Sequence, residues 1–212
     1  MKKFVFVLTV LVSTLGFSQD TSAEAKALLN QVSEKVKSYD NINIDFRYVV
    51  KESALGDSRE TRGNVILEGD KYVLNILGIT RIYDGKTMYT ISPEDEEVTI
   101  SSDNTEDENT ISPSAILSFY ETGYTYAMDI TQDVSGRQIQ YVKLTPTDDT
   151  TLDFVLLGID SNTHHIYNFI EVSGDARTTL TVNSFKTNEP LSETLFIFDE
   201  SKYSNYYINR LD

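Results

Sequence analysis

The 212-residue sequence predicts a mainly antiparallel α+β fold, in which helices cover one face of a curved sheet. Three observations lead to this fold class. Residues 63–100 are short apolar runs separated by turn residues, which is typical of an antiparallel meander. Residues 42–50 alternate apolar and polar side chains, as a half-buried strand does, and residues 20–39 repeat apolar side chains with a helical period.

The first 18 residues have the pattern of a cleavable secretion signal. A basic start is followed by an apolar run too short to span a bilayer comfortably, and small residues precede a cleavage position at Gln19. The chain has no cysteine, so we expect neither disulfides nor a lipid anchor at the cleavage site. We therefore expect an exported protein with a single domain over residues 19–212. The alternative is that residues 1–18 remain as an uncleaved anchor.

Residues 20–39 are expected to form an amphipathic helix that packs on the sheet. A capping box at Thr21–Glu24 fits its start, and Asp40 breaks the periodic pattern. The apolar residues that recur on one face are Ala25, Leu28, Leu29, Val32, Val36 and Tyr39.

The next segments are expected to be strands. In residues 42–50 one face carries Ile42, Ile44, Phe46, Tyr48 and Val50. The meander that follows turns at Gly69-Asp70, at Asp84-Gly85 and at residues 93–96. Asp-Gly is favoured in two-residue hairpins, because both central residues need positive φ.

Residues 102–110 are acidic and polar and are expected to form an exposed loop. Asp103, Thr105 and Asp107 alternate loosely as in a calcium loop, but the central glycine and terminal glutamate of an EF-hand are missing. We therefore interpret the segment as a solvated loop rather than a calcium site.

A second helix is expected to begin at Ser112 as N-cap, with Pro113 at its first position, and to end at Gly123. Its residues are apolar nearly all round, so it must be buried or must meet something apolar. Two interpretations follow, a plug in the core or a lid over an apolar cavity.

Strands return in the second half of the chain, separated by turns such as Ser135-Gly136 and Gly174-Asp175. They are expected within residues 124–130, 139–144, 152–159, 166–172, 178–185 and 195–198. We find no linker and no repeat of fixed period, which favours one domain of ten or more strands and two main helices.

Charge and motif content exclude several function classes. A formal net charge of −15 disfavours nucleic-acid binding and favours a soluble monomer. No catalytic or phosphate-binding motif is present, so we expect no enzyme, no cofactor and no metal site. His164 and His165, the two histidines, are adjacent; they are expected at a turn rather than at a shared metal.

A curved antiparallel sheet that helices cover incompletely would leave a pocket for hydrocarbon. We predict a lipid-binding cavity in this position. Its predicted lining is Ile44, Phe46, Tyr48, Leu67, Leu74, Tyr89, Ile91, Ile116, Leu117 and Tyr120.

The order of motifs resembles the LolA family of periplasmic lipoprotein carriers. The best match is Asp84–Pro93, DGKTMYTISP, beside the family's DGKxxW/Y-x-Y-x-P. Gly63 at a strand start, Leu144-Thr145-Pro146 and the closing Phe196-Ile197-Phe198 also agree, so the resemblance covers nearly the whole mature chain. The family's Phe-x-Gln is Phe46-Arg47-Tyr48 here, and the arginine tied to lid closure is absent near Gly69, as in a divergent, Bacteroidota-type member.

The resemblance implies an incomplete, half-open β-barrel with helices as a lid over the cavity. It also implies a periplasmic chaperone that takes lipoprotein acyl chains from an inner-membrane ABC lipoprotein-release complex and delivers them to an outer-membrane acceptor. The runner-up interpretation is a LolA-fold module that binds another lipid or senses lipoproteins as a regulator. The third is a secreted hydrolase.

Overall fold

The computed structural model describes residues 21–53, 56, 58–102 and 117–211. These ranges contain helix α1 (Thr21–Lys37) and the 3-10 turns η2 (Phe119–Glu121) and η3 (Glu200–Tyr203). The strands are β1 (Ile42–Lys51), β2 (Ser58–Glu68), β3 (Lys71–Ile76), β4 (Ile79–Tyr83), β5 (Thr87–Ser92), β6 (Glu97–Ser102), β7 (Tyr124–Val134), β8 (Arg137–Pro146), β9 (Phe154–Asp160), β10 (Ile166–Ser173), β11 (Ala176–Thr187) and β12 (Tyr207–Leu211). The predicted secretion signal and the loosely calcium-like loop lie outside the described residues.

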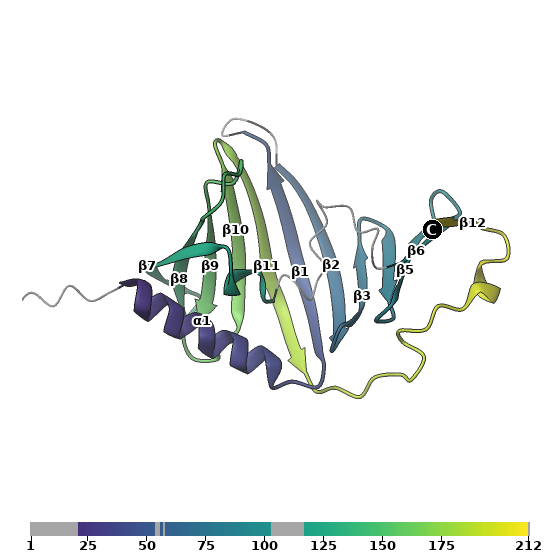
Figure 1. The fold of residues 1–212 in the computed structure, drawn as a ribbon, viewed down its shortest axis with the longest axis horizontal. Coiled ribbons are helices and arrows are strands. Elements are labelled where there is room, and N and C mark those ends of the chain that lie inside the picture. The colour runs from purple at the N-terminus through teal and green to yellow at the C-terminus, as the bar shows by residue number, and fades with distance from the viewer. Residues whose placement is uncertain (1–20, 54–55, 57, 103–116, 212) are drawn as a thin grey trace, which may run out of the picture.

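The twelve strands of the described residues form one sheet in the order β12-β6-β5-β4-β3-β2-β1-β11-β10-β9-β8-β7. Neighbouring strands are antiparallel, except that β12 runs parallel to β6. The sheet curves but does not close, since β12 and β7 are not paired with each other (Figure 1). The predicted fold class, an incomplete antiparallel barrel with helical cover, is confirmed.

Helix α1 lies across the β7–β10 part of the sheet, and we call the face that it covers the inner face (Figure 1). Ala25, Leu29 and Val32 are buried against it, as the helical period predicts. The C-terminal half of α1 is hydrogen-bonded to η2. There the Glu121 carboxylate accepts hydrogen bonds from the Ser33 hydroxyl (2.6 Å) and Lys37 (2.8 Å).

Two apolar clusters line the inner face. One joins α1 and Tyr120 to strands β8–β10, and the other joins β1–β4 around Ile44, Phe46 and Val65. Val36 and Leu117 pack against both clusters. The inner face therefore has two separately packed halves that meet near Leu117.

The hairpin turns differ in part from the prediction. Asp84-Gly85 does not form a two-residue hairpin, because Tyr83 pairs with Met88 and the Asp84 carboxylate accepts from the backbone N–H groups of Lys86 and Thr87. A turn that the sequence analysis missed lies at Leu77-Gly78, where both residues have positive φ (54° and 77°). That conformation is the one a tight two-residue hairpin requires, and Ile76 pairs with Ile79 across it.

The predicted strand at residues 195–198 is wrong. Leu195 and Phe196 lie in a turn, and the last strand is β12, farther along the chain. The aromatic side chains of this segment are held by packing rather than by strand pairing. The Phe198 ring stacks on Tyr89 (centroids 4.6 Å apart), and Lys71 lies over the Phe196 ring (5.8 Å).

Of the predicted second helix, Ser112–Ile116 lies outside the described residues. The rest of its span is short and irregular: Leu117 and Ser118 form a turn that leads into the 3-10 turn η2. Gly123, at φ +83°, follows and allows the chain to enter β7.

Candidate functional site

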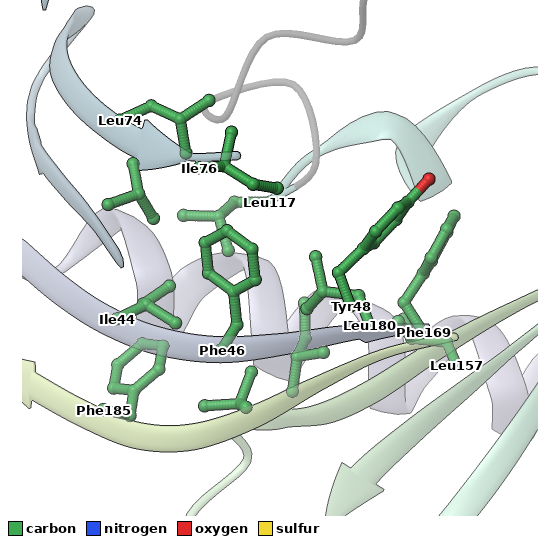
Figure 2. A pocket seen from close by; sticks show the side chains of 13 residues that line it. Ile44, Phe46, Tyr48, Leu74, Ile76, Leu117, Leu157, Phe169, Leu180 and Phe185 are labelled. Atoms are coloured by element: carbon green, nitrogen blue, oxygen red, sulfur yellow. The ribbon is translucent and has the colours of Figure 1, made fainter. Parts of the chain in front are cut away.

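The inner face holds an apolar cavity between its two packed clusters. Its volume is about 160 Å³, and its wall comes from β1, β2, β3, β9, β10 and β11 together with Leu117 (Figure 2). The lining residues are Ile44, Phe46, Tyr48, Val65, Leu74, Ile76, Leu117, Leu157, Ile166, Phe169, Leu180, Val182 and Phe185. Apart from the Tyr48 hydroxyl these side chains are hydrocarbon, so the cavity suits an apolar ligand.

Strand register explains why these side chains converge. Side chains alternate between the two faces of a strand, so Ile44, Phe46 and Tyr48 of β1 share the inner face. Tyr48 pairs with Leu180 of β11, and Leu180 pairs with Phe169 of β10. One continuous row of apolar side chains therefore crosses strands that are far apart in the sequence.

Phe46 occupies the centre of the wall, with its ring upright between the strands and Leu117 (Figure 2). Its cross-strand partner is Gly63, and a Cβ atom at residue 63 would overlap the end of the Phe46 ring. The Phe46 ring therefore occupies the space that a side chain at residue 63 would fill.

The structure brings together five of the residues predicted to line the cavity, namely Ile44, Phe46, Tyr48, Leu74 and Leu117. That they bind lipid remains a prediction.

Three further predicted lining residues lie outside the cavity lining or outside the described residues. Leu67 is buried in the β1–β4 cluster beside the cavity, and Tyr120 is buried in the cluster under α1. Neither is part of the cavity lining. Ile116 lies outside the described residues.

Tyr89 and Ile91 require a correction, because they lie on the opposite face of the sheet. Tyr89 pairs with Ile82, and Ile82 pairs with Val73, whereas the cavity residue Leu74 pairs with Arg81. Neighbouring residues in a strand point to opposite faces, so this register excludes Tyr89 from the cavity. Phe198 of the C-terminal segment covers Tyr89 there.

The predicted lining did not include the half of the cavity wall that β9–β11 contribute. Leu157, Phe169 and the β11 residues Leu180, Val182 and Phe185 all line it. A signal was present, because residues 180 and 182 alternate with polar neighbours in the pattern that identified β1. The one-residue irregularity opposite Asp45 and Phe46 explains why Phe185, rather than residue 184, faces inward.

Beyond the cavity residue Phe169, the inner face of β10 carries a carboxylate. Glu171 follows Phe169 by two residues on the same face of β10. Burial raises the pKa of Glu171 above its ordinary value. Burial, and secondly the charge of Glu171, raise the pKa values of Tyr48 and Tyr124.

At another part of the wall, His165 stacks on the cavity residue Phe185 (centroids 4.2 Å apart, planes at 25°). The Tyr39 hydroxyl is hydrogen-bonded to His165 Nε2 at 2.7 Å. Burial, and then the charge of Lys35, lower the pKa of His165. The neutral ring is therefore favoured beside the cavity.

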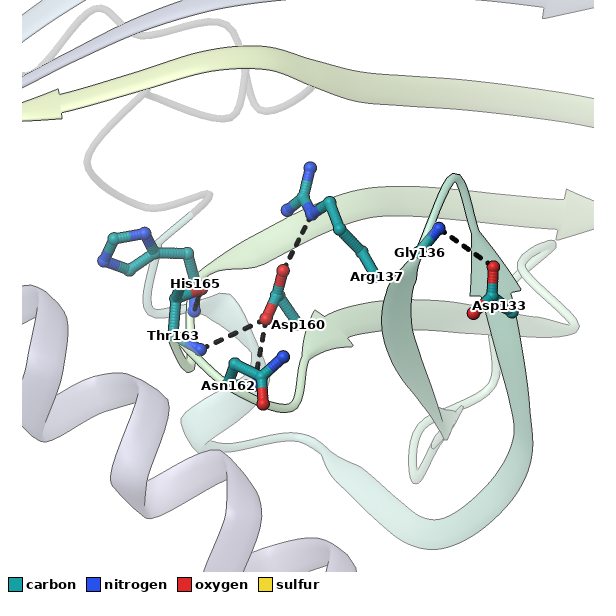
Figure 3. Close-up of polar contacts among 7 residues, drawn as sticks. All are labelled: Asp133, Gly136, Arg137, Asp160, Asn162, Thr163 and His165. Atoms are coloured by element: carbon teal, nitrogen blue, oxygen red, sulfur yellow. Dashed lines mark hydrogen bonds and ion pairs between the residues drawn. The ribbon is translucent and has the colours of Figure 1, made fainter.

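The turn before His165 is organised by Asp160 (Figure 3). Its carboxylate accepts from Arg137 (2.8 Å) and from the backbone N–H groups of Asn162 (2.9 Å) and Thr163 (3.1 Å). His164 ends this turn with φ +56° and His165 follows it directly, so the prediction that the two histidines lie at a turn is confirmed. These contacts fix the position of His165.

In the part of the chain that the structure describes, no group of three or more His, Cys, Asp or Glu side chains could hold a metal ion. The helices in these same ranges are too short or too polar to cross a bilayer.

Comparisons with known proteins agree with this architecture. The family model described as outer membrane lipoprotein carrier protein LolA matches residues 79–199, more than half of the chain. No curated protein matches the sequence.

Among solved structures, an uncharacterized conserved protein from Thermus thermophilus has a TM-score of 0.61 at 10% identity, over 89% of this chain and 99% of that one. A putative outer membrane lipoprotein-sorting protein domain from Vibrio parahaemolyticus gives 0.48 at 11% identity, over 83% and 97%. Lipoprotein LppX from Mycobacterium tuberculosis gives 0.46 at 16% identity, over 80% and 98%. The first of these likenesses shows a shared fold.

Proposed function

Because the chain belongs to the LolA family of outer membrane lipoprotein carrier proteins, we propose that it is a periplasmic carrier that holds lipoprotein acyl chains in its apolar cavity. The observation that carries the proposal is the cavity itself, whose hydrocarbon wall is formed by side chains of the sheet and by Leu117. Each methylene removed from water contributes about 0.8 kcal/mol, so such a wall can offset much of the cost of moving a lipid anchor through water.

The size of the cavity indicates how cargo would enter. A volume of about 160 Å³ matches an engineered cavity of about 150 Å³ that binds benzene, and is far smaller than two or three acyl chains require. Binding therefore requires the two packed clusters of the inner face to move apart. Leu117 and Val36 of α1, which pack against both clusters from outside the sheet, are the described residues that must shift.

Partial shielding suits a carrier better than complete burial. A site that buried dozens of methylenes fully would release its cargo too slowly to transfer it. On this proposal the protein is exported by its N-terminal segment, receives cargo from an inner-membrane ABC complex and passes it to an outer-membrane acceptor. The site has no catalytic role in this proposal.

The test is to incubate the purified protein with membrane vesicles that hold labelled lipoproteins, and to measure the label recovered in soluble complex. Val182→Phe would fill the cavity and should reduce recovery by about tenfold, roughly 1.4 kcal/mol. The matched control is Asn183→Phe, which adds the same ring to the exposed neighbouring position. Wild-type protein that extracts no lipoprotein would refute the proposal.

Native mass spectrometry of the recovered complex gives the mass of the cargo. A mass equal to that of a lipoprotein supports the carrier role. The mass of a free lipid would replace it with the role of a binding module for another lipid.

A further inference from the structure

Glu171 is a carboxylate near the apolar cavity that has no hydrogen-bond or ion-pair partner among the described residues. It lies two residues beyond Phe169 on the inner face of β10, opposite Thr178 of β11 and Val155 of β9. No side chain or backbone group of the described residues donates a hydrogen bond to its carboxylate or forms an ion pair with it. A half-buried charge of this kind costs free energy unless a ligand compensates it.

Aromatic rings gather around Phe169, two residues before Glu171 on β10. The ring of Phe119 meets Phe169 edge-on (centroids 5.1 Å apart, planes at 90°) and Tyr124 in the same manner (5.7 Å, 88°). Burial, and secondly the charge of Glu171, raise the pKa values of Tyr48 and Tyr124. Tyr48 lines the cavity as well, so the aromatic group connects the hydrocarbon wall with the carboxylate.

Arg59 is a cationic side chain in the same row of the sheet as Glu171, but it does not neutralise the carboxylate. Arg59 pairs with Val50, which pairs with Thr178, so a strand separates Arg59 from the Thr178–Glu171 pair. Arg59 is ion-paired with Glu52 at 2.7 Å and is largely exposed. No ion pair with a described residue therefore neutralises Glu171, which leaves its charge for a ligand.

We propose that the cavity selects amphiphiles that carry an ammonium group, with the hydrocarbon against Phe46 and Leu180 and the cation between Glu171 and the rings of Tyr48 and Tyr124. Aromatic faces attract cations, and recognition of ammonium ligands by aromatic rings is an established use of that attraction. This inference rests on the proposed lipid-binding function and adds a headgroup class to it. The ammonium group can belong to an aminolipid or to the free amino terminus of a lipidated polypeptide.

The experiment compares three surfactants of equal chain length by calorimetry, below their micellar concentrations and in about 0.15 M salt, which screens exposed charges beyond about 8 Å. They are dodecyltrimethylammonium, dodecyl maltoside and dodecyl sulfate. The wild type should bind the ammonium probe about tenfold more tightly than the maltoside. Glu171→Gln should remove this preference and leave maltoside binding unchanged.

The matched control is Glu193→Gln, which removes one exposed carboxylate in the segment that follows β11. This variant should keep the preference for the ammonium probe. A second variant, Tyr124→Leu, should reduce the preference without altering maltoside binding, and it tests the inference independently if the Glu171 variant is unstable. Equal binding of ammonium and maltoside by the wild type, or a preference that survives Glu171→Gln, would overturn the inference and leave the proposed function intact. Failure to bind any of the three probes would overturn both.

Two further probes with a primary amino group, and their N-acetylated forms, distinguish the sources of the ammonium group. A short-chain phosphatidylethanolamine and a diacylated lipopeptide with a free amino terminus are each compared with their acetylated forms. Loss of affinity on acetylation supports the inference and identifies the source, whereas no loss for either probe contradicts it.

Discussion

The ring of Phe46 lies directly over Gly63, its partner on the neighbouring strand, and leaves no room for a Cβ atom at residue 63. Such an atom would overlap the ring and would lie 2.8 Å from the backbone oxygen of Asn75. Phe46 is buried and stands at the centre of the cavity wall. A glycine on one strand thus determines the shape of a cavity built mainly from side chains of others.

Gly63→Ala should therefore destabilise the protein and displace the Phe46 ring. Overpacking of this kind costs about 1–3 kcal/mol, measured as a loss in the free energy of unfolding by urea. The control is Thr61→Ala, two residues earlier on the same face of β2, which should change stability by less than about 0.5 kcal/mol. Equal effects of the two substitutions would show that the ring does not depend on the glycine.

Tyr89→Ala separates the two faces of the sheet. The substitution removes the stacking contact with Phe198 and should lower the free energy of unfolding by about 1 kcal/mol. Binding of a hydrocarbon probe should remain within about twofold, because Tyr89 lies on the face away from the cavity. Phe46→Ala, by contrast, should weaken both stability and binding. A tenfold loss of binding in Tyr89→Ala would contradict the assigned register.

Asp160→Asn should destabilise the turn before His165 in a pH-dependent manner. Burial opposes the charged form of Asp160, but hydrogen bonds from Arg137 and from the Asn162 and Thr163 backbone outweigh it and lower the pKa below the ordinary 3.8. The charged form therefore contributes stability above pH 3.8, and this contribution is lost as the pH falls through the lower, folded-state pKa.

At pH 7 the variant should be less stable than the wild type by about 1–3 kcal/mol. Urea denaturation at a series of pH values should show the two curves converging at acid pH. A difference that stays constant down to pH 2 would exclude the charge as its cause.

His165→Gln should reduce the sensitivity of the fold to mild acid. Burial and then the charge of Lys35 lower the pKa of His165 below 6.5, so between 6.5 and that lower value the unfolded chain takes up a proton that the folded chain does not. Stability contributed by the neutral ring is present above pH 6.5 and is lost as the pH falls toward the folded-state pKa. The stability lost between pH 7.5 and pH 5 should be smaller in the variant.

The control for that experiment is His164→Asn, because asparagine tolerates the positive φ of residue 164. This variant should keep the acid sensitivity of the wild type. If it lost as much sensitivity as His165→Gln, the assignment to the buried ring would be wrong.

The sequence alone determined the elements with strong local periodicity. The buried face of α1 and the inward side chains of β1 follow from periods of 3.6 and 2, which depend on backbone geometry within one segment. The order of motifs likewise indicated the family. Five cavity residues, from Ile44 to Leu117, were found from these local signals.

Only the tertiary structure decided which face Tyr89 occupies, which strands complete the cavity and which side chains the C-terminal aromatic residues cover. Each depends on register between strands, and a shift of one residue exchanges the two faces of a strand. Tyr48, Leu180 and Phe169 meet because β1, β11 and β10 are neighbours in the sheet, although β1 is remote from the other two in the chain. Periodicity within a segment carries no information about such pairing, because it records that a strand has two unlike faces but not which neighbour each face meets.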